Sequence, residues 1–388
     1  MENSIAERVA RMERSQIRVM FDMAEAHDGD LVRLEVGEPD FAPPEHVTEA
    51  AVEAARSGKV NYTSNAGIFE LREAVSDRMA TDHDVAVDPE QVVVTVGALE
   101  ALHLAMVTLV DPGEEVVIPT PAWPNYVGQV RLADGKLVEV PLPAEDGFAL
   151  DADRVVEAIT DDTAVVVLNS PSNPTGRVFD PEDVRQVAAA AADHDAFVIA
   201  DEAYLALAFE GDRRGIAAIV DEPEKVITVG TCSKTYAMTG YRLGWLAAPP
   251  VVAEGAAKIH ESTTACASSI SQYAALAALT GPQEPTRNMR ESFRERRNLV
   301  VDRVAEIPHV SCAEPEGAFY AFLDVSALDG TSLDVAKRLL REGGVVVAPG
   351  EGFGDAGQGH VRLSFASSPE DLHEGLDGIE ALVRDELE

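Results

Sequence analysis

Lys234 is the residue whose surroundings in the sequence point most directly to chemistry. It follows the apolar run 226–230, it lies in the segment Thr231-Cys232-Ser233-Lys234-Thr235, and Arg242 comes eight residues later. A lysine that leaves a buried strand beside another cation can lose its proton, because burial and a neighbouring positive charge both disfavour the ammonium form. A neutral amine can attack an aldehyde. We therefore expect Lys234 to take part in covalent chemistry.

Pyridoxal phosphate is the aldehyde cofactor that fits this segment. Its aldehyde would form a Schiff base with Lys234, and Thr231, Ser233 and Arg242 would supply hydroxyl groups and a fixed positive fork for its phosphate. A surface lysine at the end of a strand would produce the same segment, so the segment alone leaves both interpretations open.

Two other apolar runs end in polar residues that this cofactor needs. Asp201 follows the run 196–200, and ligands of open α/β sheets bind at the carboxyl ends of strands. A carboxylate there can keep a pyridine nitrogen protonated, which makes the ring an electron sink for a substrate carbanion. Tyr204, and Asn173 in the turn that follows the run 165–168, are candidate partners of the phenolic oxygen of the ring. Asp and Asn also favour turns and caps for reasons unrelated to a ligand.

A third segment predicts a phosphate cup. Residues 91–96 read as a strand, Gly97-Ala98 as a tight turn, and the apolar stretch from Leu99 to Val110 as a helix. The free backbone N–H groups at the start of such a helix point at an anion, so Ala98 and Leu99 are expected to bind the phosphate together with Arg242. A glycine turn that only ends a strand is the alternative.

The ordered set of these motifs resembles the class I aminotransferases of the aspartate aminotransferase fold. The resemblance covers nearly the whole chain, and the set is far more specific than any one of its pieces. It is carried, in chain order, by Gly37-Glu38-Pro39-Asp40, Tyr62…Gly67…Leu71-Arg72, Gly97-Ala98-Leu99, Trp123, Asn173-Pro174-Thr175-Gly176, Asp201-x-x-Tyr204, Ser233-Lys234 and Arg362.

The resemblance implies a role around the cofactor for each matching residue. Lys234 would form the internal aldimine and later move the proton between the substrate Cα and the cofactor C4′. Asp201 would pair with the pyridinium nitrogen, and Asn173 and Tyr204 with the phenolic oxygen. Trp123 would stack on the ring, and both Trp123 and Asn173 would also border the substrate.

The resemblance further implies a substrate clamp and a homodimer. Arg362 would hold the substrate α-carboxylate, which suits a planar guanidinium, and the backbone of Gly37 would lie against the same carboxylate. Tyr62 would cross the subunit boundary to the phosphate in the neighbouring site, so the active unit would be a homodimer.

The implied reaction moves the amino group of an L-amino acid to 2-oxoglutarate through the Lys234 aldimine and pyridoxamine phosphate. Amino acids and 2-oxo acids would be the substrates, with aspartate expected as the donor and an aromatic or alanine aminotransferase as the alternative. The same fold serves aminocyclopropane synthases and carbon–sulfur β-lyases, which are a further alternative. A cofactor-sensing regulator would need a DNA-binding module, for which the chain has neither length nor a basic patch.

The choice of substrate is the point on which the motifs disagree. The segment from Glu261 to Tyr273 resembles the bacterial aspartate-using branch, yet that branch commonly has a lysine at the position of Leu99. Leu99 cannot bind a distal carboxylate. Ser15, Gln16 and Thr264 of the partner subunit could contact it through neutral hydrogen bonds, and the sequence assigns no second cation.

Composition sets the frame for this site. With 388 residues, 46% of them apolar, the chain can bury a large core and favours two structural units. Its 68 acidic and 31 basic residues give a formal net charge of −37, which suggests adaptation to high salt, a soluble acidic enzyme being the plainer alternative. Nucleic acid and anionic membranes are poor partners for such a charge. No signal segment or membrane-length apolar run is visible, so we expect a cytoplasmic protein.

The three cysteines share no metal-ligand spacing, so reduced thiols and no metal site are expected. From residue 46 to about 280, strand-like runs alternate with helix-like ones, which favours an α/β fold with a mostly parallel sheet. The resemblance identifies this as fold type I, with a large cofactor domain at 46–285 and a smaller α+β domain built from 1–45 and 286–388. Strands are expected at 31–34, 91–96, 115–118, 164–168, 197–200, 226–229, 243–246, 317–322 and 345–350, and helices over 4–26, 99–110 and 287–307.

Overall fold

A computed structural model describes residues 5–10, 12 and 14–387, and a seven-stranded sheet is its largest element. The strands are β2 (Val92–Thr95), β3 (Glu115–Thr120), β4 (Lys136–Pro141), β5 (Thr163–Asn169), β6 (Phe197–Asp201), β7 (Val226–Thr231) and β8 (Gly244–Ala247). Their order is β2-β8-β7-β6-β5-β3-β4, with β8 antiparallel to both its neighbours and every pair from β7 to β4 parallel. The predicted α/β fold with a mostly parallel sheet is confirmed.

Helices cover both faces of this sheet, because its central strands are apolar on both sides. In β5, Val165 and Val167 pack in one cluster with α5, α6 and α11, while Val166 and Leu168 pack in another with α7 and α8. The bounds of these helices are α5 (Gly97–Leu109), α6 (Asn125–Leu132), α7 (Ala152–Ala158), α8 (Pro181–Asp193) and α11 (Pro250–Thr263). A third group, α3 (Glu45–Arg56), α4 (Phe69–His83) and α12 (Ser269–Thr280), packs together beside β2.

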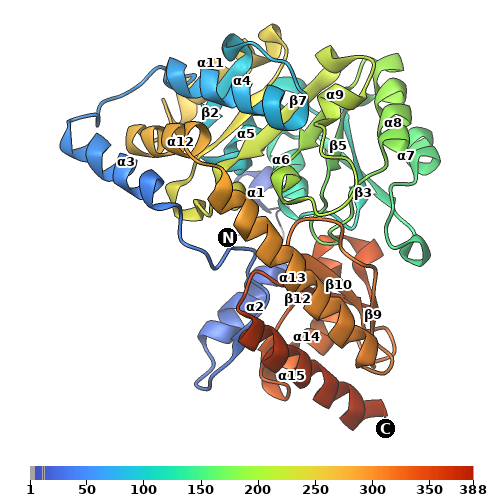
Figure 1. Cartoon of the computed structure of the whole chain (residues 1–388). Coiled ribbons are helices and arrows are strands. Elements are labelled where there is room, and N and C mark those ends of the chain that lie inside the picture. Colours follow the sequence, from blue (N-terminus) through green and yellow to red (C-terminus); the bar gives the residue numbers. More distant parts are fainter. Residues whose placement is uncertain (1–4, 11, 13, 388) are drawn as a thin grey trace.

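A smaller set of strands is built from both ends of the chain. β9 (Ser311–Cys312), β10 (Tyr320–Asp324), β12 (Ala348–Pro349) and β13 (His360–Ser364) form an antiparallel sheet, and β1 (Val32–Arg33) pairs in parallel with β11 (Val345–Val346). The helices here are α2 (Gln16–Glu25), α13 (Glu284–Glu306), α14 (Ser332–Arg341) and α15 (Pro369–Leu387). In Figure 1, α13 runs from the half that holds the larger sheet to the smaller one, which also carries α15 and the C-terminus.

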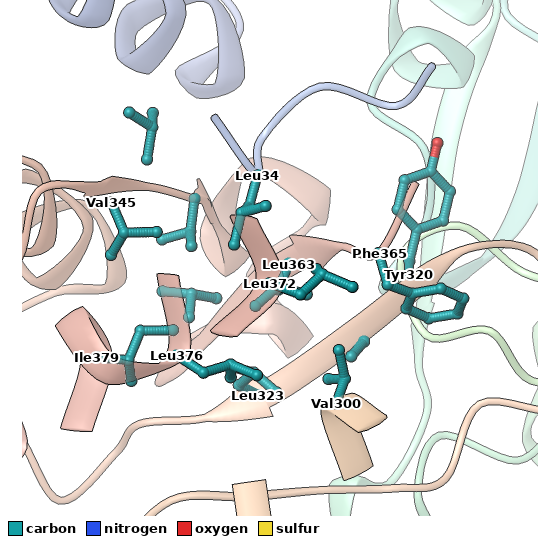
Figure 2. Packing of buried hydrophobic residues seen from close by; sticks show 14 of the residues in the cluster. Leu34, Val300, Tyr320, Leu323, Val345, Leu363, Phe365, Leu372, Leu376 and Ile379 are labelled. Atoms are coloured by element: carbon teal, nitrogen blue, oxygen red, sulfur yellow. The ribbon is translucent and has the colours of Figure 1, made fainter. Parts of the chain in front are cut away.

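The smaller part has a core of its own. Leu34, which follows β1, packs in one buried cluster with Leu363 of β13 and Leu376 of α15, so residues from the two ends of the chain share this core. Figure 2 shows Tyr320 at the edge of the cluster, with its hydroxyl group pointing away from the other labelled side chains. The predicted boundaries at residues 45 and 285 stay a prediction.

Three predicted elements are corrected by the structure. The helix expected over residues 4–26 is two helices, α1 (Glu7–Ala10) and α2, separated by Ser15 in an extended conformation; residues 1–4, 11 and 13 lie outside the described part. The break lets Arg14 pair with Asp22, which an unbroken helix would hold about 12 Å further along its axis. The single strand expected at 345–350 is divided between two sheets, as β11 and β12. The strand expected from 317 begins at Tyr320, because Ala318 has a positive φ of 59°.

Within the described residues, no helix is long and apolar enough to cross a membrane.

Candidate active site

A cavity of about 470 Å³ lies where the carboxyl ends of β5, β6 and β7 meet the smaller part of the molecule. It gathers every residue that the sequence nominated for the cofactor and the α-carboxylate except Tyr62; Ser15 also lines it, whereas Gln16 lines a neighbouring cavity. Those that line it are Gly37, Ala98, Leu99, Trp123, Asn173, Asp201, Tyr204, Thr231, Ser233, Lys234, Arg242 and Arg362. The larger sheet contributes strand ends and the start of α5, and the smaller part contributes Gly37 and Arg362.

Lys234 lies on the one-turn helix α10 (Cys232–Thr235) directly after β7. The Thr231 hydroxyl oxygen starts this turn by accepting a hydrogen bond of 3.1 Å from the backbone N–H of Ser233. Lys234 Nζ donates to the carbonyl oxygen of Gly37 at 2.6 Å. The pKa of Lys234 is lowered to about 8, mainly by burial and to a smaller extent by Arg362 and Arg242, while Glu38 opposes the fall. A fraction of the amine is therefore neutral near physiological pH, and the neutral fraction grows as the pH rises through 8.

Asp201 ends β6 and is buried, with 3% of its surface exposed. The Tyr126 hydroxyl donates to Asp201 Oδ2 at 2.6 Å, and the backbone N–H of Ala203 donates to Oδ1 at 3.1 Å. Burial raises the pKa of Asp201, and these two hydrogen bonds oppose the rise. Burial and the Asp201 charge also raise the pKa of Tyr126, so the phenol stays a donor. Among the described residues no cation pairs with this carboxylate, which leaves it able to accept a positively charged ligand atom.

Arg362 of β13 is held in place by hydrogen bonds that leave part of its guanidinium free. Nη1 donates to Asn173 Oδ1 at 3.0 Å, Nη2 donates to the carbonyl oxygen of Glu35 at 2.6 Å, and the group lies over the Tyr320 ring at 4.3 Å. Its Nε is buried and has no hydrogen-bond partner among the described residues. A buried donor without a partner costs free energy unless a ligand accepts from it. Arg362 is therefore prepared for an anionic group.

The start of α5 and Arg242 come together at the place where the sequence predicts a phosphate cup. Gly97 has a φ of 76°, and a Cβ there would lie 2.5 Å from Arg242 Nη2, so only glycine allows this approach. The N–H groups of Ala98 and Leu99 are at the N-terminal end of the helix, where anions bind favourably. The Thr231 hydroxyl lines the cavity but donates to the carbonyl oxygen of Leu243 at 3.0 Å, so its proton is already engaged.

Trp123, Tyr204 and Tyr62 complete the list of predicted residues. Trp123 meets Tyr126 edge to face, with ring centres 5.6 Å apart. The Tyr204 hydroxyl lies 2.9 Å from that of Tyr320, and both rings are buried. Tyr62 is 89% exposed and lies outside the cavity of this chain. Its predicted role depends on a second subunit and stays a prediction.

Tyr126, Tyr320, Glu35 and Arg18 are among the cavity residues that the sequence did not predict. Tyr126 had a usable signal, because it lies only three residues after Trp123, at the start of α6. Tyr320 lies in a segment that the sequence predicted as a strand, but nothing local linked it to Tyr204. Glu35, whose carbonyl holds Arg362, and Arg18 of α2 gave no local signal at all.

The donor set suits pyridoxal phosphate. The cup at Gly97 offers backbone N–H groups and Arg242 to a phosphate, the amine of Lys234 can meet an aldehyde, and the buried Asp201 carboxylate can pair with a ring nitrogen. In the described part of the chain, no group of three or more His, Cys, Asp or Glu side chains could hold a metal ion.

Comparisons with known proteins identify a family and relatives with similar sequences. The model of the family "aminotransferase class I and II" matches residues 29–379, a range that includes Gly37, Lys234 and Arg362. The chain is 38% identical over 384 residues to an aspartate aminotransferase of Pyrococcus horikoshii, which covers 98% of each chain. It is 36% identical over 386 residues to aromatic-amino-acid aminotransferase 2 of Thermococcus litoralis, which covers 98% of this chain and 99% of the relative.

One similar solved structure is that of Thermus thermophilus aspartate aminotransferase with maleate. It has a TM-score of 0.93 and 38% identity, and the superposition covers 98% of this chain and 100% of that one.

Proposed function

This chain belongs to the family of class I and II aminotransferases, and we propose that it moves the amino group of aspartate to 2-oxoglutarate. Like the other members of this family, it is an aminotransferase that depends on pyridoxal phosphate. The observation that carries the proposal is that Lys234 and Arg362 meet in one cavity. A carboxylate clamp and a neutral amine are what the handling of an α-amino acid requires.

Arg362 is proposed to bind the substrate α-carboxylate. Its partnerless Nε and a remaining Nη hydrogen can donate to the two carboxylate oxygens as a bidentate pair. The stacking on Tyr320 and the bond to Asn173 fix the plane of the guanidinium, so little side-chain entropy is lost on binding. The substrate Cα would then lie in the cavity that Lys234 lines.

Lys234 is proposed to carry the proton between the substrate Cα and the neighbouring carbon of the cofactor. Because the pKa of Lys234 is about 8, its amine is neutral in a large fraction of the protein molecules at pH values near 8 and can accept the proton. The contact with the Gly37 carbonyl shows one position that the amine reaches. Bound pyridoxal phosphate supplies an electron sink that stabilises negative charge at the substrate Cα.

The remaining predicted residues are proposed to hold and tune the cofactor. Asp201 would pair with the ring nitrogen, while the hydrogen bond from Tyr126 opposes the rise that burial causes in the pKa of Asp201, and Tyr204 and Asn173 would bond the phenolic oxygen. Trp123 would stack on the ring. The phosphate would accept hydrogen bonds from the backbone N–H groups of Ala98 and Leu99, from Ser233 and from Arg242, and Thr231 would border it. Gly37 would lie beside the substrate.

The choice of aspartate is supported by two of the similar proteins. The Pyrococcus relative is an aspartate aminotransferase, and the Thermus enzyme was solved with maleate, a dicarboxylate. The Thermococcus relative is an aromatic-amino-acid aminotransferase, and Leu99 adds an apolar surface, so an aromatic or alanine donor is the second candidate.

We also propose that the enzyme is a homodimer adapted to high salt. Tyr62 is 89% exposed and Val60 56% exposed on the segment between α3 and α4, where a second subunit would cover them and receive Tyr62 near its phosphate. The net charge of −37 is the basis for salt adaptation, because screening would reduce its self-repulsion. A cytoplasmic location stays a prediction of the sequence.

A donor survey of the holoenzyme tests the proposal. Purified enzyme would be mixed with 2-oxoglutarate and, in turn, aspartate, alanine, phenylalanine or tyrosine, in dilute buffer and in molar potassium chloride, and the oxo acid and glutamate would be quantified. The highest kcat/KM for aspartate supports the proposal. A higher value for phenylalanine or tyrosine selects the aromatic alternative. Pyruvate and ammonia released together with a thiol from added cystathionine, without formation of glutamate from the other donors, would assign the enzyme to the carbon–sulfur lyases.

A further inference from the structure

We propose that Arg18 binds the distal carboxylate of a dicarboxylic substrate, an inference that rests on the proposed aminotransferase function. Arg18 lies in the first turns of α2, and its side chain lines the same cavity as Lys234 and Arg362. No second cation is predicted for this site from the sequence. The structure supplies one.

The cations that line the cavity in the described residues are Arg18, Lys234, Arg242 and Arg362. Three of them have tasks that do not involve a distal group. Lys234 is the reactive amine, Arg242 approaches Gly97 at the phosphate cup, and Arg362 is fixed by Asn173 and Glu35 for the α-carboxylate. Arg18 is the positive charge that remains for a second carboxylate.

Arg18 is oriented by its neighbours without being neutralised by them. Its guanidinium lies over the Phe21 ring at 4.5 Å, and its Nε pairs with Asp22 Oδ1 at 3.0 Å. The same Asp22 carboxylate also pairs with Arg14, so one negative charge is divided between two guanidiniums. Among the described residues no carboxylate other than that of Asp22 pairs with Arg18, and the terminal amino groups of a guanidinium can bind a further carboxylate as a bidentate pair.

The position of Arg18 also agrees with what the cavity lacks. Leu99 lines the cavity but has no charge, and Ser15, which also lines it, can give only neutral hydrogen bonds. The Arg18 side chain is 61% exposed, so substrate binding would withdraw it from water and strengthen its pairing with a carboxylate. At 1 M salt the Debye length is about 3 Å, so a contact at hydrogen-bond distance would survive where longer-range attraction would not.

The chain offers a matched control in Arg14. It is the same residue type and pairs with the same Asp22, but it lines a neighbouring cavity of about 280 Å³ instead of the one with Lys234. An Arg18 that only stabilises α2 through an ordinary surface ion pair would behave like Arg14. A substrate-binding Arg18 would not.

The test compares Arg18→Ala, Arg18→Lys and Arg14→Ala with the wild-type enzyme. We expect Arg18→Ala to lower kcat/KM for aspartate and glutamate roughly tenfold or more, because hydrogen bonds between charged groups are lost, while alanine stays within about twofold. Arg18→Lys should recover part of the loss. Arg14→Ala should leave the ratio of aspartate to alanine unchanged.

Equilibrium binding gives a second measurement that does not depend on turnover. Titration calorimetry of the holoenzyme with succinate and with propionate would measure the gain from a second carboxylate. The inference predicts tighter succinate binding in wild type and loss of that gain in Arg18→Ala alone. An unchanged gain in Arg18→Ala, or equal losses for aspartate and alanine, overturns it.

Failure of this inference can be told apart from failure of the proposed function. A wild-type enzyme that transaminates aspartate with a ratio insensitive to Arg18 overturns only the assignment of Arg18. A wild type that transaminates none of the tested donors contradicts the proposed function, and the succinate titration still decides whether Arg18 binds a second carboxylate.

Discussion

Replacing Tyr126 with phenylalanine tests how the protein tunes its buried carboxylate. The substitution removes the hydroxyl that donates to Asp201 Oδ2 at 2.6 Å and leaves the ring, which packs against Trp123. Hydrogen bonds to charged groups contribute about 1.5–3 kcal/mol. Because this bond opposes the effect of burial, its loss raises the pKa of Asp201 and weakens the carboxylate as a partner of the ring nitrogen.

The expected result is a slower enzyme with an altered pH profile. Since about 1.4 kcal/mol corresponds to a tenfold change in rate, loss of the full hydrogen-bond energy in the transition state lowers kcat roughly ten- to hundredfold. The acid limb of the profile should move to higher pH, because a more basic Asp201 takes up a proton earlier. The assay is kcat for the aspartate half-reaction from pH 5 to 9.

Tyr236→Phe is the matched control for Tyr126→Phe. Tyr236 is also a buried tyrosine, but its hydroxyl donates to Gln283 Oε1 at 2.9 Å and does not line the cavity. Both variants should lose a similar amount of stability, so a fall in activity confined to Tyr126→Phe isolates the contact with Asp201. A Tyr126→Phe enzyme with the wild-type acid limb and kcat within twofold of wild type would refute the reasoning.

Two further substitutions test the stability and the specificity of the site. Burial raises the pKa of Glu202 to about 7, so the stability that this carboxyl contributes is present below about pH 4.5 and is lost as the pH rises through 7. Glu202→Gln keeps an acceptor for the Ile216 N–H. The variant should therefore unfold at a higher temperature than wild type at pH 8, and at a similar temperature at pH 4. Equal unfolding temperatures of the two proteins at pH 8 would count against this reasoning. Leu99→Lys should raise the ratio of aspartate to phenylalanine kcat/KM severalfold, because it adds a cation to the cavity, and no rise would mean that position 99 does not face the distal group.

The sequence could predict the residues that strand ends position. Asp201, Asn173 and Lys234 each follow an apolar run, and the carboxyl ends of neighbouring parallel strands meet at one edge of a sheet. The spacing and order of those apolar runs therefore predicted most of the residues that meet in the cavity. Arg362 came only from the resemblance, since nothing local distinguishes it from another strand arginine.

The remaining contacts depend on packing that no local pattern contains. Tyr126 reaches Asp201 across 75 residues of sequence, and Arg18 reaches the cavity only because α2 packs beside β11, β12 and α14. The break before α2 was missed because the amphipathic spacing continues through Ser15, whose backbone is not helical and whose side chain forms no cap. Residues 345–350 are apolar along their length, so the sequence gives no sign that they divide between two sheets. Pairing with β1 and with β13 decides the division into β11 and β12.

The most direct test of the central claim is a single-turnover measurement on wild type and Lys234→Ala. Each protein, loaded with pyridoxal phosphate, would receive aspartate while the visible band of the bound cofactor and the oxaloacetate formed are followed together. The account predicts that wild type loses its band and yields one equivalent of oxaloacetate, and that Lys234→Ala, folded by circular dichroism, lacks the wild-type band and yields none. A variant with an unaltered visible spectrum and undiminished oxaloacetate would contradict the assignment of Lys234 as the reactive amine.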